Sequence, residues 1–461
     1  MTSSSMKVAL NQPRSFDVAV LGGGPAGLAV ALTLHRYSPL SVAVIERTNY
    51  DAPRIGETLS PGVTGLLQYL GVWESFQADR HLPSFGTSAT WGSPSPSTRD
   101  FILTPFGPGW HLNRRRFDQT LASQAETAGA LVLRSARARF ERRAEGGWRL
   151  DIQSEGICHK IEARFLVDAT GKSAAVARYE GATRQIQDRM VAVVATVELP
   201  HPAPADTLTL VETWEGGWWY STPLLGPQMI VALMTDADLM RAHNWSAPEP
   251  WWQLLGNQPQ TWGRLKEGRL ASPPSIVPAF SAVLDRVVGR EWIAVGDAAA
   301  TYDPLSSSGI ARAIDSGIHA ARAIYTYLNS GHYDALIDYD QRMRTSFELY
   351  EETRRRYYEM EQRWPQSLFW RRRQRLVTLD PNSRIELAAS ADAAASIPSL
   401  PTHLSGIDHR LLFRLCAIPR PAHEVVADFQ RRSMHAVSDL VVVLALEWWQ
   451  QSRIVKVIPD R

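Results

Sequence analysis

The stretch FDVAVLGGGPAGLAVALTLHRYSPLSVAVIERT, residues 16–48, decides the fold of the first part of this chain. An apolar run leads into a glycine-rich turn, a run of small apolar residues follows, and a second apolar run ends at Glu46. Gly22, Gly24 and Gly27 match G-x-G-x-x-G, in which glycine permits a tight turn and the close approach of a diphosphate. This order predicts a Rossmann-type dinucleotide-binding unit, with Glu46 accepting hydrogen bonds from ribose hydroxyls.

The composition is that of an ordinary globular protein. The 461 residues are 44% hydrophobic and carry a net charge of +2, which argues against a general affinity for nucleic acid or for a membrane surface. Cys158 and Cys416 have no C-x-x-C spacing, so neither a disulfide framework nor a metal site is predicted. The N-terminus has no apolar signal segment, and the apolar run at 440–446 is far shorter than the roughly 20 residues that span a bilayer. We expect a cytoplasmic protein without a membrane, nucleic-acid or metal partner.

Four further segments resemble, in the same order, motifs of FAD-dependent aromatic hydroxylases and halogenases. They are RIGETLSPGV (54–63), HLNRRRFDQTLASQAETAGA (111–130), FLVDATGKSAAVAR (165–178) and WIAVGDAAATYDPLSSSGI (292–310). The glycine turn alone leaves NAD and FAD open, whereas this resemblance implies FAD, with Arg114 meeting the FAD phosphates.

The resemblance also implies a domain organisation for an α/β protein. A Rossmann-type FAD-binding domain of the aromatic-hydroxylase kind would comprise residues 1–80, 106–185 and 280–330. A β-sheet substrate domain would comprise 81–105 and 186–279, and a helical C-terminal extension would follow over 331–461.

The last of these segments also has a physical interpretation of its own. Asp297 ends a buried strand and can accept a hydrogen bond from a ribityl hydroxyl of FAD. Gly309 opens a helix whose N-terminal amides can stabilise the negative charge of a reduced flavin. The alternative is that 303–310 is an ordinary helix-capping turn. The residues expected to bind FAD are Gly22, Gly24, Gly27, Glu46, Arg54, Arg114, Asp297, Pro304, Gly309 and Ile310.

Halogenation is disfavoured by residues that the resemblance would require. WWYSTP at 218–223 departs from the Trp-x-Trp-x-Ile-Pro motif of the tryptophan halogenases. No lysine occurs between Lys7 and Lys160, where those enzymes carry a lysine, and arginine cannot replace it because its charge is permanent. Ser306 stands where they carry a glutamate. We therefore favour direct hydroxylation.

The expected activity is hydroxylation of an aromatic ring by an FAD-dependent monooxygenase that uses O2 through a flavin C4a-hydroperoxide. Within the superfamily the chain resembles the peptidyl-tryptophan dihydroxylases of tryptophylquinone cofactor biogenesis. This implies a partner polypeptide that bears the target tryptophan. A small-molecule aromatic hydroxylase, a halogenase and a non-catalytic flavoprotein maturation factor stay open, and electrons could come from NAD(P)H or from a separate reductase.

Candidate catalytic and substrate-binding residues follow from these segments. Those near the expected flavin are Ser308, Gly309, Glu57 and His111. Trp218, Trp219 and Tyr220 could line a pocket for an indole ring, or they could simply be the core of a sheet.

The region beyond residue 330 is predicted to be mainly helical. Residues 351–375 carry eight arginines and four acidic residues. These arginines either are solvated on a helix that covers the flavin domain or form a docking surface for an acidic protein substrate.

Overall fold

The computed structural model describes residues 13–52, 54–101, 104–201, 207–374, 379–380, 382–388, 407–433, 439–452 and 454–458. They form two compact units, Met1–Phe347 with Met360–Trp370, and Glu348–Glu359 with Arg371–Arg461. The boundary expected between residues 330 and 331 therefore falls inside the first unit. Helix α11 (Asp334–Glu359) begins there, and its buried Tyr339 donates a hydrogen bond to the carbonyl of Ala294 at 2.9 Å.

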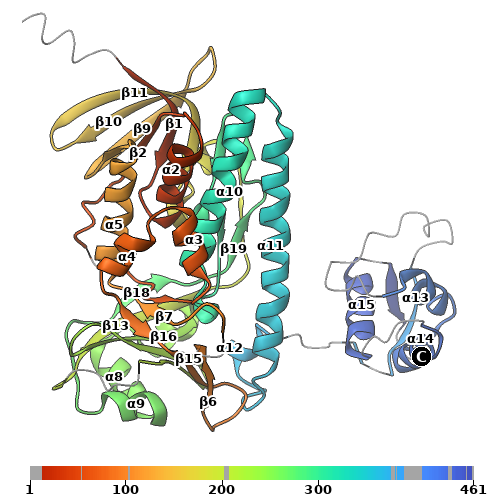
Figure 1. Ribbon diagram of the computed structural model, residues 1–461. Helices are drawn as coiled ribbons and strands as arrows, with labels where there is room; N and C mark the ends of the chain where they lie inside the picture. Colours follow the sequence, from red (N-terminus) through yellow and green to blue (C-terminus); the bar gives the residue numbers. More distant parts are fainter. Residues whose placement is uncertain are drawn as a thin grey trace, which may run out of the picture. The chain divides into compact units, whose positions relative to one another are not determined.

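The first sheet is built around the strand of the glycine motif (Figure 1). Its order is β20-β21-β11-β1-β2-β8, parallel except for β20, and β10 and β9 extend it antiparallel from β11. Its strands are β1 (Arg14–Leu21), β2 (Val42–Ile45), β8 (Leu131–Leu133), β9 (Ala136–Arg142), β10 (Trp148–Ser154), β11 (Ile157–Asp168), β20 (Val288–Gly289) and β21 (Trp292–Ala294). Continuous apolar runs suit these parallel strands, because β2 and the ends of β1 and β11 are fully buried.

Helices pack against this sheet and against one another. They are α2 (Pro25–Tyr37), α3 (Val63–Tyr69), α4 (Trp73–Ala78), α5 (Arg114–Thr127), α6 (Ala175–Tyr179) and α10 (Gly309–Ser330). Helix α2 follows the glycine turn directly and packs along α10. The strand, turn, helix and strand predicted from residues 16–48 are confirmed.

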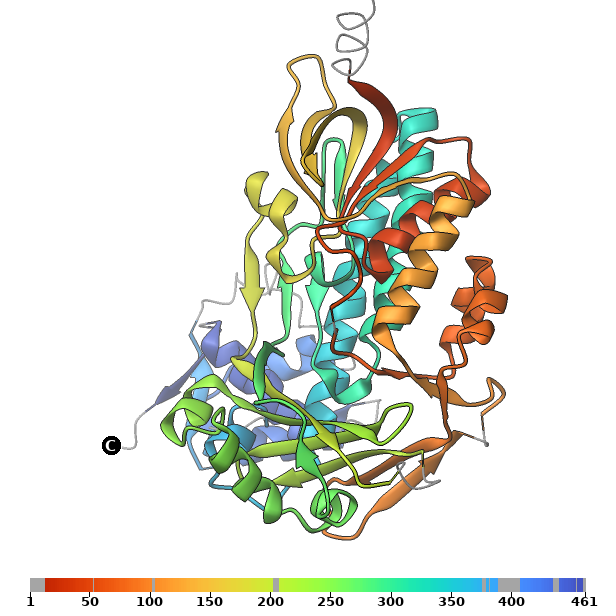
Figure 2. The same cartoon turned by 90° about the vertical axis from the view of Figure 1, so that its left-hand side faces the viewer.

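A second sheet lies apart from the first, as Figure 2 shows for its green strands and flanking helices. Its order is β17-β13-β16-β15-β14-β5-β6, and β18 also pairs with β13. Its elements are β5 (Gly86–Thr90), β6 (Ser97–Asp100), β13 (Met190–Glu198), β14 (Thr209–Trp214), β15 (Gly217–Pro223), β16 (Gln228–Asp236), α7 (Ala237–Ala242), α8 (Pro248–Gly256), α9 (Pro259–Leu265), β17 (Arg269–Leu270) and β18 (Ser275–Pro278). All lie within the two ranges expected for the substrate domain.

Two small sheets complete the first unit. One joins β3 (Thr58–Leu59), β7 (Gly109–His111) and β4 (Leu82–Ser84), and the other joins β12 (Arg184–Ile186), β19 (Ala282–Leu284) and β22 (Ala300–Thr301). The first places the segment after residue 54 beside the start of α5. The second leads into the segment that precedes α10.

A buried carboxylate attaches the segment after α11 to the second sheet. Glu361 is 0% exposed, and it accepts hydrogen bonds from the Gly92 amide at 3.0 Å and from the Thr213 hydroxyl at 2.9 Å. Arg363 donates to the same carboxylate at 2.9 Å. Burial would raise the pKa of Glu361, but the hydrogen bonds from Arg363 and Gly92 outweigh burial and lower it.

The second unit combines helices with a small sheet. Helices α13 (His409–Leu415), α14 (Ala422–Arg432) and α15 (Asp439–Gln451) share an apolar core with β23 (Arg384–Leu387) and β25 (Val455–Ile458), and β24 (Arg420–Pro421) completes the sheet. The expected extension is thus helical in large part, but it also contains strands that the sequence analysis did not predict. No helix in the described ranges is long and apolar enough to cross a membrane.

The arginine-rich stretch 351–375 does not form one element of the structure. It is divided between the two compact units, and residue 375 lies outside the described residues. Its role as a docking surface stays a prediction.

Replacing Glu361 with glutamine should destabilise the protein by about 2 kcal/mol, because Arg363 would lose its charged partner. Urea unfolding measures this change. Folding lowers the pKa of Glu361, so this carboxylate stabilises the folded protein fully at pH values above the ordinary carboxyl pKa. That contribution is lost as the pH falls through the lowered pKa. The variant should therefore lose less stability on acidification than the parent. Glu145→Gln, which breaks an exposed ion pair, is the control.

Candidate functional site

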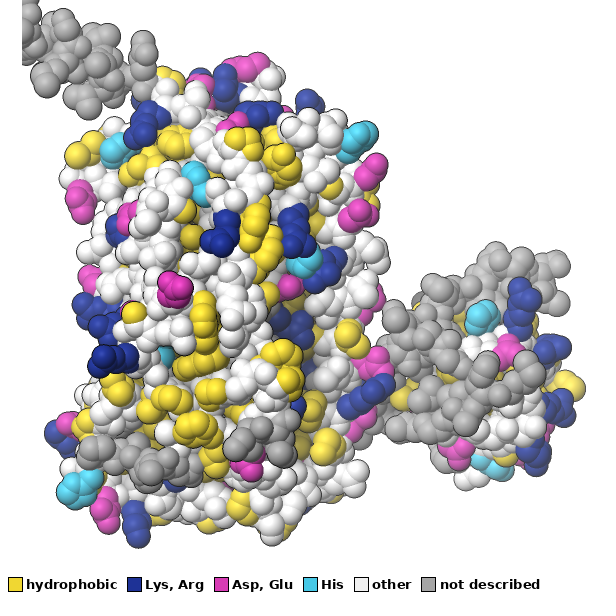
Figure 3. Space-filling model, in the orientation of Figure 1, with side chains coloured by type: hydrophobic (Ala, Val, Ile, Leu, Met, Phe, Trp, Pro, Cys, Tyr) yellow, Lys and Arg dark blue, Asp and Glu magenta, His cyan; other side chains and the backbone are white. Residues whose placement is uncertain are grey.

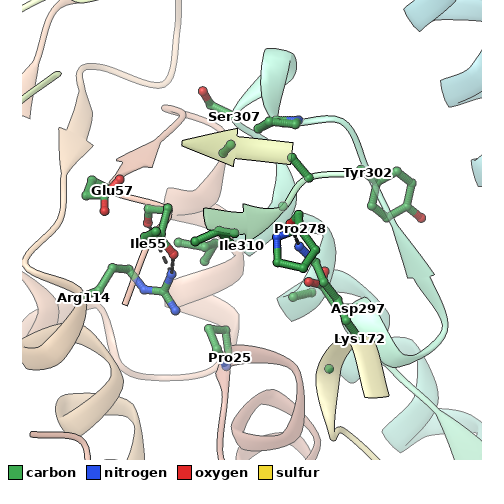
Figure 4. Close-up of a pocket in the computed structure, with 18 of the residues that line it drawn as sticks. Pro25, Ile55, Glu57, Arg114, Lys172, Pro278, Asp297, Tyr302, Ser307 and Ile310 are labelled. Carbon is green, nitrogen blue, oxygen red and sulfur yellow. Dashed lines mark hydrogen bonds between the residues drawn. The ribbon is translucent and has the colours of Figure 1, made fainter. Parts of the chain in front are cut away.

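A cavity of about 360 Å³ opens where the glycine turn, the segment after residue 54 and the start of α10 meet the second sheet. Figure 4 shows Arg114 and Ile55 on one side of it and Asp297 with Lys172 on another. Every residue of its lining belongs to the first unit. Segments far apart in the sequence therefore converge on one site.

The glycine turn is compact at two positions and open at the third. An added Cβ at Gly22, where φ is +111°, would lie 2.1 Å from the Ala169 carbonyl oxygen, and one at Gly27 would lie 2.1 Å from the Gly22 oxygen. A Cβ at Gly24 would meet nothing within 4 Å, and Gly24 lines the cavity. The start of α2 thus faces open space there, as binding of a diphosphate at a helix N-terminus requires.

Glu46 is held by the turn itself. Its buried carboxylate accepts hydrogen bonds from the Gly23 amide at 2.8 Å and from the Thr48 amide at 3.0 Å. Arg54 forms an ion pair with Glu46 at 3.0 Å and another with Asp118 at 3.0 Å. Glu46 and Arg54 stand beside the turn but outside the lining of this cavity, so their contact with FAD stays a prediction.

Arg114 brings a fixed positive charge to the cavity. It lies at the first position of α5, and its Nη1 donates to the carbonyl oxygen of Ile55 at 2.6 Å. Its Nη2 pairs with Asp118 at 3.1 Å. The guanidinium therefore holds the segment after residue 54 and lines the cavity at the same time. A charge so placed suits a diphosphate.

Asp297 and Lys172 stand next to each other in the cavity wall (Figure 4). Removal from solvent raises the pKa of Asp297, and Lys172 and Arg184 act in the opposite direction. Burial likewise lowers the pKa of the Lys172 ammonium, which donates a hydrogen bond to the carbonyl of Pro278. The cavity thus contains a lysine even though the stretch between Lys7 and Lys160 has none, so the absence of lysine from that stretch does not exclude a halogenase. Lys172 was not among the candidate residues, because its place in the cavity depends on the distant segment of Pro278.

The segment before α10 leaves that helix without a side-chain cap. Ser308 occupies the N-cap position but makes no capping hydrogen bond, and its hydroxyl instead accepts from Arg312 Nε at 3.0 Å and lies 2.7 Å from the Ser306 hydroxyl. Pro304, Gly309 and Ile310 line the cavity, whereas Ser308 does not. The helix start is thus free to bind a ligand oxygen, which favours a ligand-binding turn over a simple capping turn.

A polar pair lies where the segment after residue 54 meets the second sheet. Glu57 is buried and lines the cavity, and burial raises the pKa of its carboxyl. Tyr220 also lines the cavity, and its hydroxyl lies 2.5 Å from the Thr58 hydroxyl. Burial and the neighbouring Glu57 raise the pKa of Tyr220. Burial therefore favours the protonated form of both groups.

Three other candidate residues lie outside the cavity lining. His111 Nε2 donates to the Thr207 carbonyl at 2.6 Å, so its Nδ1 must accept from the Thr222 hydroxyl at 2.7 Å. Burial lowers the pKa of His111 to about 4, and the ring is neutral. Trp218 and Trp219 are fully buried in the core. Of the aromatic run, only Tyr220 reaches the cavity.

The donors and the open space fit FAD. The α2 start and Arg114 would hold the diphosphate, Asp297 would bind the ribityl chain, and the amides of the α10 start would face the ring.

Comparison with known proteins supports this fit. A model of the tryptophan halogenase family matches residues 17–108 and 78–399. The putative FAD-dependent oxidoreductase LodB of Marinomonas mediterranea is 32% identical over 363 residues, which cover 78% of this chain and 97% of that protein.

Two solved structures share the fold. The myxobacterial chondrochloren halogenase CndH superposes with a TM-score of 0.72 at 25% identity, covering 79% of this chain and 87% of that one. The peptidyl tryptophan dihydroxylase QhpG, described as essential for tryptophylquinone cofactor biogenesis, superposes with a TM-score of 0.63 at 24% identity, covering 78% of each chain.

Substitutions at Gly27 and Gly24, which have different surroundings, distinguish an effect on folding from an effect on cofactor binding. Gly27→Ala should unfold the turn, since its methyl group would overlap the Gly22 carbonyl oxygen. Gly24→Ala should fold normally but bind FAD at least 10-fold more weakly, because its methyl group would stand where the diphosphate must approach. Circular dichroism and the FAD content after gel filtration measure both effects. Equal FAD content in the Gly24 variant and the parent would contradict this assignment.

Proposed function

The chain belongs to the tryptophan halogenase family of flavin-dependent oxidoreductases, and on this basis we propose that it is an FAD-dependent monooxygenase that hydroxylates a tryptophan side chain within a partner polypeptide. The observation that carries the proposal is the placement of the buried Glu57 and of Tyr220 together on the wall of the FAD cavity. The structural likeness to QhpG supports a peptidyl tryptophan as the substrate.

FAD, when bound, would supply the electron transfer that activates O2. Each hydroxylation replaces a ring C–H bond with C–OH, consumes one O2 and two electrons, and releases water. The protein must therefore deliver a proton to the oxygen atom that leaves as water, and it must keep bulk water out.

Glu57 can deliver that proton. Burial raises the pKa of its carboxyl, because removal from solvent disfavours the charged form. The Tyr220 hydroxyl, fixed by Thr58, stands close enough to Glu57 for the carboxylate charge to affect its own pKa. We assign Glu57 as the proton donor and Tyr220 as the group that orients the substrate ring.

The apolar part of the cavity suits an indole ring. Ile230, Ala232 and Met234 of β16 and Val277 of β18 line the side formed by the second sheet. These side chains offer surface for an aromatic ring and exclude water from the reacting atoms.

Halogenation is the second candidate, and Lys172 is the observation that favours it. A lysine amine in the cavity could handle an oxidised halogen, as the resemblance to halogenases implies. Its ammonium group is bound to the Pro278 carbonyl and lies beside Asp297, so it is occupied by partners in the protein. To act on a halogen, Lys172 would have to leave these partners. Hydroxylation does not require this, and we rank it first.

Isotopically labelled O2 distinguishes these candidates. The FAD-loaded protein is incubated with a reductant and a synthetic tryptophan-containing peptide, with bromide present, and the peptide is analysed by mass spectrometry. We expect labelled oxygen in the tryptophan. A brominated peptide would instead support halogenation. Labelled hydrogen peroxide without a modified peptide would contradict both, and oxygenation of a free small aromatic compound alone would contradict the peptide substrate.

Glu57→Gln should lower the hydroxylation rate about 100-fold, because the amide cannot donate an acidic proton. The FAD absorbance should be unchanged. Since the protonated form acts and its pKa is raised, the parent's rate should fall as pH rises through that pKa. The variant should show no such fall. The exposed Glu74→Gln is the matched control, and an unaltered pH profile in the Glu57 variant would refute the assignment.

A further inference from the structure

A second cavity of about 610 Å³ adjoins the first. The two share Ile55, Glu57, Arg114 and Ile230 in their linings, so only this narrow wall separates them. The mechanism proposed above uses the first cavity and assigns nothing to the second, which we call the arginine cleft. Its position offers a direct approach to Glu57 from outside.

The rim of the cleft carries cations without partners. Arg54, Arg114 and Arg116 are paired with carboxylates of the protein. Arg80 and Arg115 also line the cleft, they are exposed, and neither has an ion-pair partner among the described residues. Arg80 has a φ of +52°, a backbone conformation that non-glycine residues rarely adopt. The fold thus holds free guanidinium groups at this rim.

A buried imidazole gives a second, independent indication of a ligand. His81 lines the cleft with its side chain 1% exposed, and its Nε2 has no hydrogen-bond partner in the described structure. The nearest carboxylate oxygen, Asp79 Oδ2, lies 3.7 Å from it, beyond hydrogen-bonding distance. Buried polar atoms without a partner are uncommon in native proteins, and a ligand in the cleft could supply one.

The opposite rim is apolar and exposed. Ile55 is 41% exposed and Leu225 is 71% exposed, and both line the cleft. Figure 3 shows hydrophobic side chains gathered over the lower part of this face, where Figure 1 draws β13, β16 and β18. A dinucleotide would leave these side chains exposed, whereas a polypeptide segment can cover them and also meet the arginines.

We propose that the arginine cleft binds the polypeptide substrate, through acidic residues that pair with Arg80 and Arg115 and apolar residues that cover Ile55 and Leu225. This inference rests on the proposed function, because it identifies the entry for the same substrate. It places the docking surface in the first unit and not in the arginine-rich stretch 351–375. The tryptophan of the segment would pass the wall at Ile55 into the first cavity.

Peptide binding to the FAD-loaded protein tests this inference without turnover. The probe is a fluorescent peptide with one tryptophan between acidic residues, and a peptide with lysines in their place is the control. Arg80→Glu with Arg115→Glu should weaken binding of the acidic peptide about 10-fold or more, and raised salt should reduce the difference. FAD content should be unchanged. The matched control is Arg355→Glu with Arg356→Glu, which reverses charge in the stretch 351–375.

The outcomes separate the inference from the proposed function. Equal binding by the cleft variant and the parent, or a loss confined to the Arg355 and Arg356 variant, would overturn the inference. Displacement of the peptide by NADPH with equal dependence on Arg80 and Arg115 would assign the cleft to a dinucleotide and overturn it as well. A bound peptide that is never oxygenated would refute the proposed function alone. Oxygenation with equal KM in parent and cleft variant would refute the cleft alone.

Discussion

The site depends on one guanidinium that joins two buried carboxylates. Arg54 forms ion pairs with Glu46 and with Asp118. Glu46 also accepts a hydrogen bond from the Gly23 amide, and Asp118 also forms an ion pair with Arg114. The glycine turn, the segment after residue 54 and the start of α5 are therefore connected through charged hydrogen bonds. Losing Arg54 would leave the buried Glu46 carboxylate without a cation, and breaking a buried pair in this way costs about 3–5 kcal/mol. These contacts keep the three segments at the same cavity.

One face of strand β15 in the second sheet packs in the core, and its other face lines the cavity. On β15, Trp219 packs against Trp251 of α8, with ring centroids 5.2 Å apart, while Tyr220 turns to the other face. Side chains alternate along a strand, so adjacent aromatic residues must have different surroundings. The helices on the outer face stabilise the sheet. The inner face is left for the ligand cavity.

Two carboxyl groups in the same cavity differ in their neighbours, and this difference suits them to different tasks. Three cations, Lys172, Arg184 and Arg114, favour the charged form of Asp297, whereas Arg114 alone does so for Glu57, which has Tyr220 beside it. Burial acts on both in the same direction. The cations around Asp297 suit it to binding hydroxyl groups, and the raised pKa of Glu57 suits that carboxyl to proton delivery.

The sequence by itself determined the Rossmann-type unit and its glycine turn, because strand and helix periods and glycine spacing are local properties of residues 16–48. It also indicated the flavin segments around Glu57, Arg114 and Asp297. Only the tertiary structure decided that Lys172 lines the cavity, that His111 is a neutral residue outside it, and that Tyr220 alone of the aromatic run faces it. Those outcomes depend on packing between segments more than 50 residues apart, such as Lys172 with Pro278, which no local pattern encodes.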